Sequence, residues 1–111
     1  MKTHEIQHTL GYRPVFEPYD DVEIVDAYTS DLLSDVMAHA ADGGVLITIQ
    51  AHKNTIAVAE LTGQKAIILC NSREAPADMI EAARQENIAL FQTQHDQYTA
   101  SWKIHSLLTQ G

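Results

Sequence analysis

Short apolar runs place the strongest constraint on how this chain folds. Val45–Ile49, Ala66–Leu69 and Ile88–Phe91 are almost entirely apolar, and segments with helical periodicity separate them. Runs of this kind predict strands that are buried on both faces of a sheet. Strands that alternate with helices indicate right-handed crossovers. We therefore expect an α/β fold with three layers: a mostly parallel sheet of about four to five strands, with helices on both faces.

The remaining elements follow from caps and periodicity. Val22–Ala27 alternates apolar and polar residues, which predicts a further strand near an edge of the sheet. Helices are expected from Ser30 or Asp31 through Ala41, from about Asn54 to Thr62, from Pro76 onward, and from about Asp96 to Leu108.

The chain of 111 residues fits a single domain. Residues 1–19 are expected to form an N-terminal segment, with a short helix at His4–Leu10 and an extended stretch at Arg13–Phe16. Residues 20–111 are expected to form the α/β domain itself.

Charge and composition exclude several classes of protein. The formal net charge of −8 argues against nucleic acid as a partner, because binding the phosphates of a nucleic-acid backbone needs clustered Lys and Arg. No apolar run is long enough to span a membrane, no signal peptide is visible, and Cys70 is the only cysteine, so we expect a cytoplasmic protein. From Glu17 to Asp35 the chain has seven acidic residues and no basic one. This stretch is either a solvated acidic edge or a docking surface for a basic partner or a cation.

Motifs for catalysis and for metal binding are missing. Neither the P-loop pattern nor Gly-x-Gly-x-x-Gly occurs, so a kinase acting alone is rejected. Cys70 follows a strand, where a reactive thiol is conceivable, but a buried structural cysteine fits its surroundings better. His4 and His8 share one helix face, yet a metal site needs three or more ligands. We expect no catalytic residues, no metal and no cofactor.

Polar side chains gather where the predicted strands end. Because ligands bind beyond the carboxyl ends of parallel strands, these residues are the candidate site for a small anionic ligand. They are Ser30, Asp31, Gln50, His52, Lys53, Asn54, Asn71, Arg73 and Thr93. The alternative is structural, since Ser, Asp and Asn at such positions also cap helices and satisfy loop backbone.

Two segments carry a resemblance to a known family. The stretch from Ala27 to Ala38 and the stretch from Ile47 to Ala59 together resemble the DRTGG domain family. That family is similar to the non-catalytic N-terminal domain of HPr serine kinase/phosphorylase. The resemblance covers nearly all the chain, and it implies a dimeric domain that serves regulation.

These observations support three hypotheses about function. The leading one is a regulatory or adaptor domain that forms a symmetric homodimer and binds another protein, with Tyr98 or Trp102 as an interface anchor and a small ligand at the strand ends. The second is a sensor of a nucleotide or phosphorylated metabolite, held by Lys53 or Arg73. The third is a small enzyme that uses His52 or Cys70.

Overall fold

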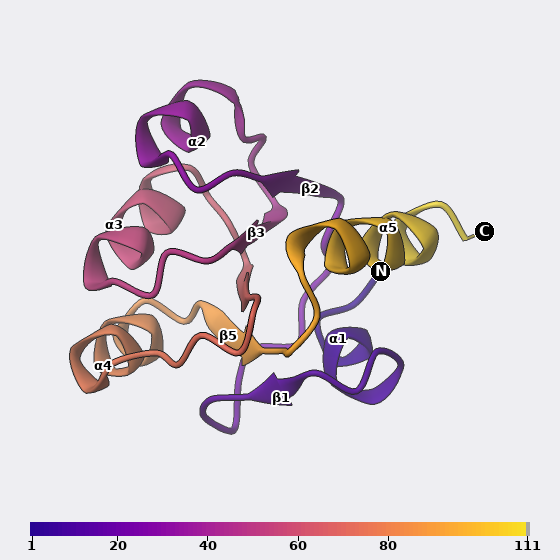
Figure 1. Ribbon diagram of the computed structural model, residues 1–111, viewed down its shortest axis with the longest axis horizontal. Coiled ribbons are helices and arrows are strands. Elements are labelled where there is room, and N and C mark those ends of the chain that lie inside the picture. The colour runs from indigo at the N-terminus through magenta and orange to yellow at the C-terminus, as the bar shows by residue number, and fades with distance from the viewer. Residues whose placement is uncertain (111) are drawn as a thin grey trace.

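The structure is a computed structural model that describes residues 1–110 (Figure 1). Within these residues it has one five-stranded sheet in the order β1-β5-β4-β3-β2. The strands are β1 (Arg13–Pro14), β2 (Asp26–Thr29), β3 (Gly44–Thr48), β4 (Ala66–Leu69) and β5 (Ala89–Gln92). β2 to β5 are parallel to one another, and β1 runs antiparallel to β5.

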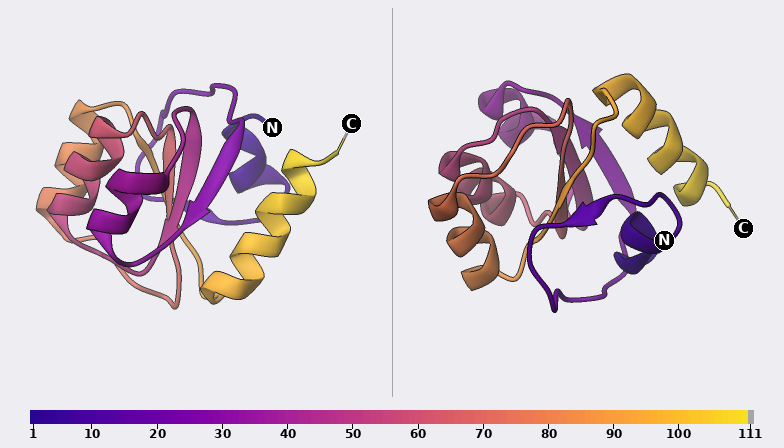
Figure 2. Two further views of the ribbon diagram at one scale, coloured as in Figure 1. Left: turned by 90° about the horizontal axis from the view of Figure 1, so that it is seen from above. Right: turned by 60° about the horizontal axis from the view of Figure 1, so that its bottom comes forward.

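Helices cover both faces of this sheet. They are α1 (His4–His8), α2 (Leu33–His39), α3 (Lys53–Leu61), α4 (Ala77–Gln85) and α5 (Gln97–Leu108). Figure 2 shows α2, α3 and α4 on one face of the sheet, and α1 and α5 on the other. The expected three-layer α/β architecture is confirmed.

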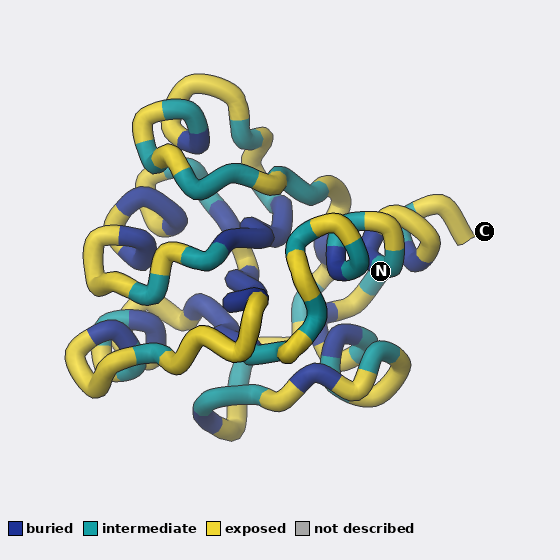
Figure 3. Tube along the Cα trace, viewed as in Figure 1, coloured by how far each residue is buried: buried dark blue, intermediate teal, exposed yellow. Residues whose placement is uncertain are grey.

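The core consists of two apolar clusters, one on each face of the sheet. Side chains alternate between the faces of a strand, so Val45 and Ile47 of β3 face the α1 and α5 side, whereas Leu46 faces α2, α3 and α4. All five residues of β3 and all four of β4 are buried (Figure 3). Burial on both faces explains why the sequence of these strands is continuously apolar.

The first parallel strand begins later than the sequence predicts. We expected a strand over Val22–Ala27, but β2 spans Asp26–Thr29. The reason is that the backbone before β2 pairs with the N-terminus instead: the Thr3 N–H donates to Val22 O (3.0 Å), and the Ile24 N–H donates to Met1 O (2.7 Å). The fully buried Ile24 then packs beneath the sheet with Ile6 of α1.

The crossovers bring the ends of β2, β3, β4 and β5 to one edge of the sheet, which we call the carboxyl edge. At the two lateral edges lie β1 and β2, the outermost strands in the sheet order. In the described part of the chain, no helix has the length and apolar character that crossing a membrane requires.

Candidate functional site

Asp31 is the centre of the hydrogen bonding at the carboxyl edge. Its Oδ1 atom accepts three hydrogen bonds: from Thr48 Oγ1 (3.0 Å), the Ile49 N–H (2.9 Å) and Gln97 Nε2 (2.9 Å). These donors come from the end of β3 and from α5, so Asp31 ties the β2–α2 loop to both elements. The structure places Asp31 as a structural linker rather than as the cap of α2. Ser30 does not cap α2 either: the N-cap is Leu32, which has no side-chain cap, and Ser30 Oγ accepts from the Leu32 N–H (3.2 Å) just before the helix.

Gln50, His52 and Asn54 also engage in internal contacts. Gln50 Nε2 donates to Asp31 O (2.9 Å), and Gln50 O accepts from Thr55 Oγ1 (2.8 Å). The N-cap of α3 is His52, whose Nδ1 accepts from the Asn54 N–H (3.0 Å). Lys53 and Asn54 line a hollow of about 300 Å³ between α3 and α4. The structure therefore brings Ser30, Asp31 and Gln50 together and turns Lys53 toward a different surface.

The turn between β4 and α4 has an unusual backbone. Asn71 (φ 59°) and Ser72 (φ 56°) both lie in the left-handed region, which non-glycine residues seldom adopt. Their N–H groups donate to His95 O and Thr93 O, each at 2.9 Å, and the Arg73 N–H closes the turn on Cys70 O (3.2 Å). The turn is thereby fixed against the loop that follows β5. The exposed Arg73 forms no ion pair among residues 1–110.

A hollow of about 390 Å³ lies beside this turn, and we call it the Arg13 hollow. Its lining residues are Leu10, Gly11, Tyr12, Arg13, Gln92, Thr93, Gln94 and His95. A smaller hollow of about 190 Å³ shares Arg13, Gln92, Thr93 and Gln94 and adds Ser72 and Glu74. Of the predicted site residues, Thr93 lines both hollows. Sequence reasoning missed Arg13, because it belongs to an N-terminal segment whose pairing with β5 no local pattern reveals.

Tyr12 and His95 are held together inside the Arg13 hollow. The Tyr12 hydroxyl lies 3.0 Å from His95 Nδ1, and the two rings meet edge to face. Burial raises the pKa of Tyr12 to about 12, so the phenol keeps its proton at neutral pH. A Tyr12 hydroxyl that donates to Nδ1 leaves the imidazole proton on Nε2. This pair fixes the ring of His95 at the wall of the hollow.

Cys70 is fully buried in the cluster that faces α1 and α5. Burial raises the pKa of its thiol to about 12, and Asp96 and Asp31 add to that effect. A protonated, inaccessible thiol is not a nucleophile. Among residues 1–110, no three His, Cys, Asp or Glu side chains lie close enough together to hold a metal ion.

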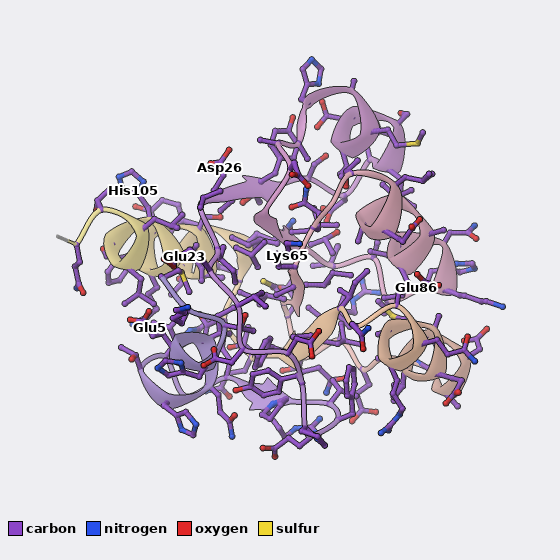
Figure 4. All side chains as sticks on the ribbon, turned by 180° about the vertical axis from the view of Figure 1, so that it is seen from behind. Glu5, Glu23, Asp26, Lys65, Glu86 and His105 are labelled. Carbon is purple, nitrogen blue, oxygen red and sulfur yellow. The ribbon has the colours of Figure 1, made fainter. Side chains whose placement is uncertain are left out.

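A second surface lies at the opposite lateral edge, and we call it the β2–α5 groove. It has a volume of about 420 Å³ and is lined by Asp26, Ala27, Thr29, Ile47, Tyr98, Ser101, Trp102, His105 and Leu108. Tyr98 and Trp102 remain 79% and 50% exposed, respectively. Thr29 Oγ1 and Ser101 Oγ lie 2.7 Å apart, and this hydrogen bond joins β2 to α5 within the lining of the groove. Figure 4 shows Asp26 on β2 and His105 on α5 on the same side of the molecule.

The fold of this chain is similar to that of a solved structure. One solved structure that it resembles is the CBS and DRTGG domains of the regulatory region of Clostridium perfringens pyrophosphatase, complexed with the activator diadenosine tetraphosphate. The TM-score is 0.68 at 17% identity, and the match covers 90% of this chain. The chain spans 44% of the length of that regulatory region. At this identity the likeness establishes the fold.

No family model matches the sequence, and no curated protein matches it. The resemblance to DRTGG domains is therefore supported at the level of the fold.

Proposed function

We propose that this chain is a non-catalytic regulatory or adaptor domain that acts by protein interaction and forms a homodimer through the β2–α5 groove. The observation that carries this proposal is an outermost strand beside an apolar groove. β2 has β3 on one side and no strand on the other within the described residues, so one row of its backbone groups is open to a partner. Trp102 and Tyr98, residue types enriched at interface anchors, stand exposed at the same place.

Charge favours a second copy of the chain as the occupant. A two-fold interface uses the same patch on both subunits, so the patch must complement itself. Asp26 on β2 supplies a carboxylate, and α5 supplies His105 together with Lys103, whose Nζ lies 4.8 Å from the centre of the Trp102 ring. Antiparallel pairing of two β2 strands would set the Asp26 side of each copy toward the α5 side of the other. In this arrangement opposite charges flank an apolar centre.

A ligand-sensing role is the second candidate, because the structural neighbour is a regulatory region whose activator is diadenosine tetraphosphate. The proposed ligand residues at the carboxyl edge are those named from the sequence: Ser30, Asp31, Gln50, His52, Lys53, Asn54, Asn71, Arg73 and Thr93. In this version replacing Lys53 or Arg73 by Ala abolishes binding and leaves the fold intact. We also propose that the protein is cytoplasmic and that it binds a separate protein partner.

The homodimer is tested by light scattering coupled to gel filtration. The wild type is expected at twice the 12.3 kDa chain mass. Trp102→Glu places a carboxylate in the apolar centre and is expected to give monomers. Leu61→Glu is the matched control, since Leu61 is 69% exposed at the end of α3. A wild type that stays monomeric at high concentration, or equal effects of the two variants, would count against the interface.

A further inference from the structure

The side chains that line the Arg13 hollow offer hydrogen-bond donors without partners. Within residues 1–110, the Arg13 guanidinium forms no ion pair and no side-chain hydrogen bond, and the same holds for the Gln94 amide. Gln92 is already oriented, because its Oε1 accepts from the Ala75 N–H at 2.8 Å. A planar amide with its oxygen fixed in this way presents its two N–H donors on the other side. His95, held by Tyr12, adds a further donor where its proton resides on Nε2.

The charges around the hollow select for an anion. The chain as a whole carries a formal net charge of −8, which repels anions from most of its surface. The residues that line the Arg13 hollow include one arginine and no carboxylate. Glu74 lines the smaller hollow, which Arg13, Gln92 and Gln94 also line, so its carboxylate disfavours an anion on that side of the arginine. The most favourable position for negative charge is therefore beside the Arg13 guanidinium, within the larger hollow.

We propose that the Arg13 hollow binds a small metabolite through a phosphate group, with Arg13 as the principal anchor and Gln92, Gln94 and His95 as further donors. Arginine matches phosphate geometry because its planar fork can donate two parallel hydrogen bonds. The volume of about 390 Å³ lies in the range of small-molecule sites.

This proposal deepens the ligand-sensing candidate and is independent of the homodimer. It moves the anchor from Lys53 and Arg73 to a residue of the N-terminal segment. The neighbouring turn supplies a supporting observation, because left-handed conformations at Asn71 and Ser72 cost energy and such strain collects at functional sites.

The test is a titration of the full chain with inorganic phosphate, AMP and citrate, followed by amide chemical shifts in NMR spectra. Saturable shifts are expected at the amides of residues 11–13 and 92–95, with phosphate and AMP but not with citrate. Arg13→Gln should weaken phosphate binding about tenfold or more, because it removes charge-assisted hydrogen bonds, each of which contributes about a tenfold gain in affinity. Lys65→Gln is the control: it removes the same charge from an exposed residue before β4, at the other end of the strand (Figure 4).

Two further variants sharpen the result. Glu74→Gln removes the nearby carboxylate and should tighten phosphate binding. Gln94→Glu adds a carboxylate to an exposed position on the hollow and should abolish binding, which keeps the test decisive if Arg13→Gln does not fold. The proposal is overturned by an absence of saturable shifts, by equal effects of Arg13→Gln and Lys65→Gln, or by shifts that map elsewhere. Citrate binding as tight as phosphate binding would overturn the assignment of a phosphate.

Discussion

Replacing Asp31 by Ala tests whether the carboxyl edge is built around one carboxylate. The change removes an acceptor of three hydrogen bonds, from Thr48, Ile49 and Gln97. Thr48 is fully buried, so water cannot replace its partner, whereas Ile49 and Gln97 are partly exposed. A donor left without an acceptor costs about 1–3 kcal/mol, and the lower value suits the two exposed donors. The expected loss in the free energy of unfolding is therefore at least about 3 kcal/mol.

Urea denaturation, followed by circular dichroism and by the fluorescence of Trp102, measures this loss directly. In a thermal melt it corresponds to a fall of roughly 10 °C for a domain of this size. Asp31→Asn keeps the Oδ1 acceptor and should cost about 1 kcal/mol. The control is Asp20→Ala, since Asp20 is exposed and makes no side-chain hydrogen bond or ion pair in the described part of the chain. A loss below about 1 kcal/mol for Asp31→Ala would refute the structural role assigned to it.

Three more predictions follow from single residues. Hydrogen bonds at the start of α5 lower the pKa of Asp96 below 3.8. The ionised form therefore stabilises the fold above pH 3.8, and this contribution disappears as the pH falls through the native pKa. In thermal melts at several pH values, the higher stability of the wild type relative to Asp96→Asn should vanish at low pH. Cys70, buried with a pKa of about 12, should react with a thiol reagent at pH 8 only as fast as the protein unfolds, and rapid labelling would contradict its burial. Gly63→Ala should cost more than about 1 kcal/mol in denaturation, because φ is +73° and the new methyl group would meet Asp42; at Gly11, where φ is +76° and no atom is near, the same change should cost less.

The buried strands could be predicted well from the sequence, because a strand that is buried on both faces consists almost entirely of apolar residues. β3 and β4 are apolar at nearly every position, and only the α/β architecture places such strands between two layers of helices. β2 carries no such mark, since it is an outermost strand with exposed and half-buried residues. Its start is set by the pairing of residues 22–24 with the N-terminus, a contact between segments that no local pattern contains.

The candidate site was harder to predict, because a polar residue after a strand can form hydrogen bonds either within the protein or with a ligand. The sequence offered Ser30, Asp31 and Asn54 as helix caps and did not indicate His52. In the structure His52 caps α3, whereas Asp31 reaches across to β3 and α5. Arg13 gave no signal, because its position beside Thr93 depends on the antiparallel pairing of β1 with β5. Arg13 was missed because its neighbours in the fold are distant in the sequence, and not because its side chain is unsuited to a binding site.

The two proposed surfaces are connected through α5, which begins directly after the loop that lines the Arg13 hollow. His95 lines the Arg13 hollow, Asp96 caps α5, and α5 carries Trp102 and His105 into the β2–α5 groove. A connecting helix is not in itself coupling, because a ligand shifts an equilibrium only if it binds two states with different affinity. Linkage then requires reciprocity: if phosphate strengthens the dimer by some factor, dimerisation must strengthen phosphate binding by the same factor. Dimer dissociation constants measured with and without phosphate, beside phosphate affinities for wild type and the monomeric Trp102→Glu variant, close this cycle. If phosphate and dimerisation strengthen or weaken each other by the same factor, and this factor differs from one, then α5 is the element that couples the two sites. If both factors equal one, the two sites are independent.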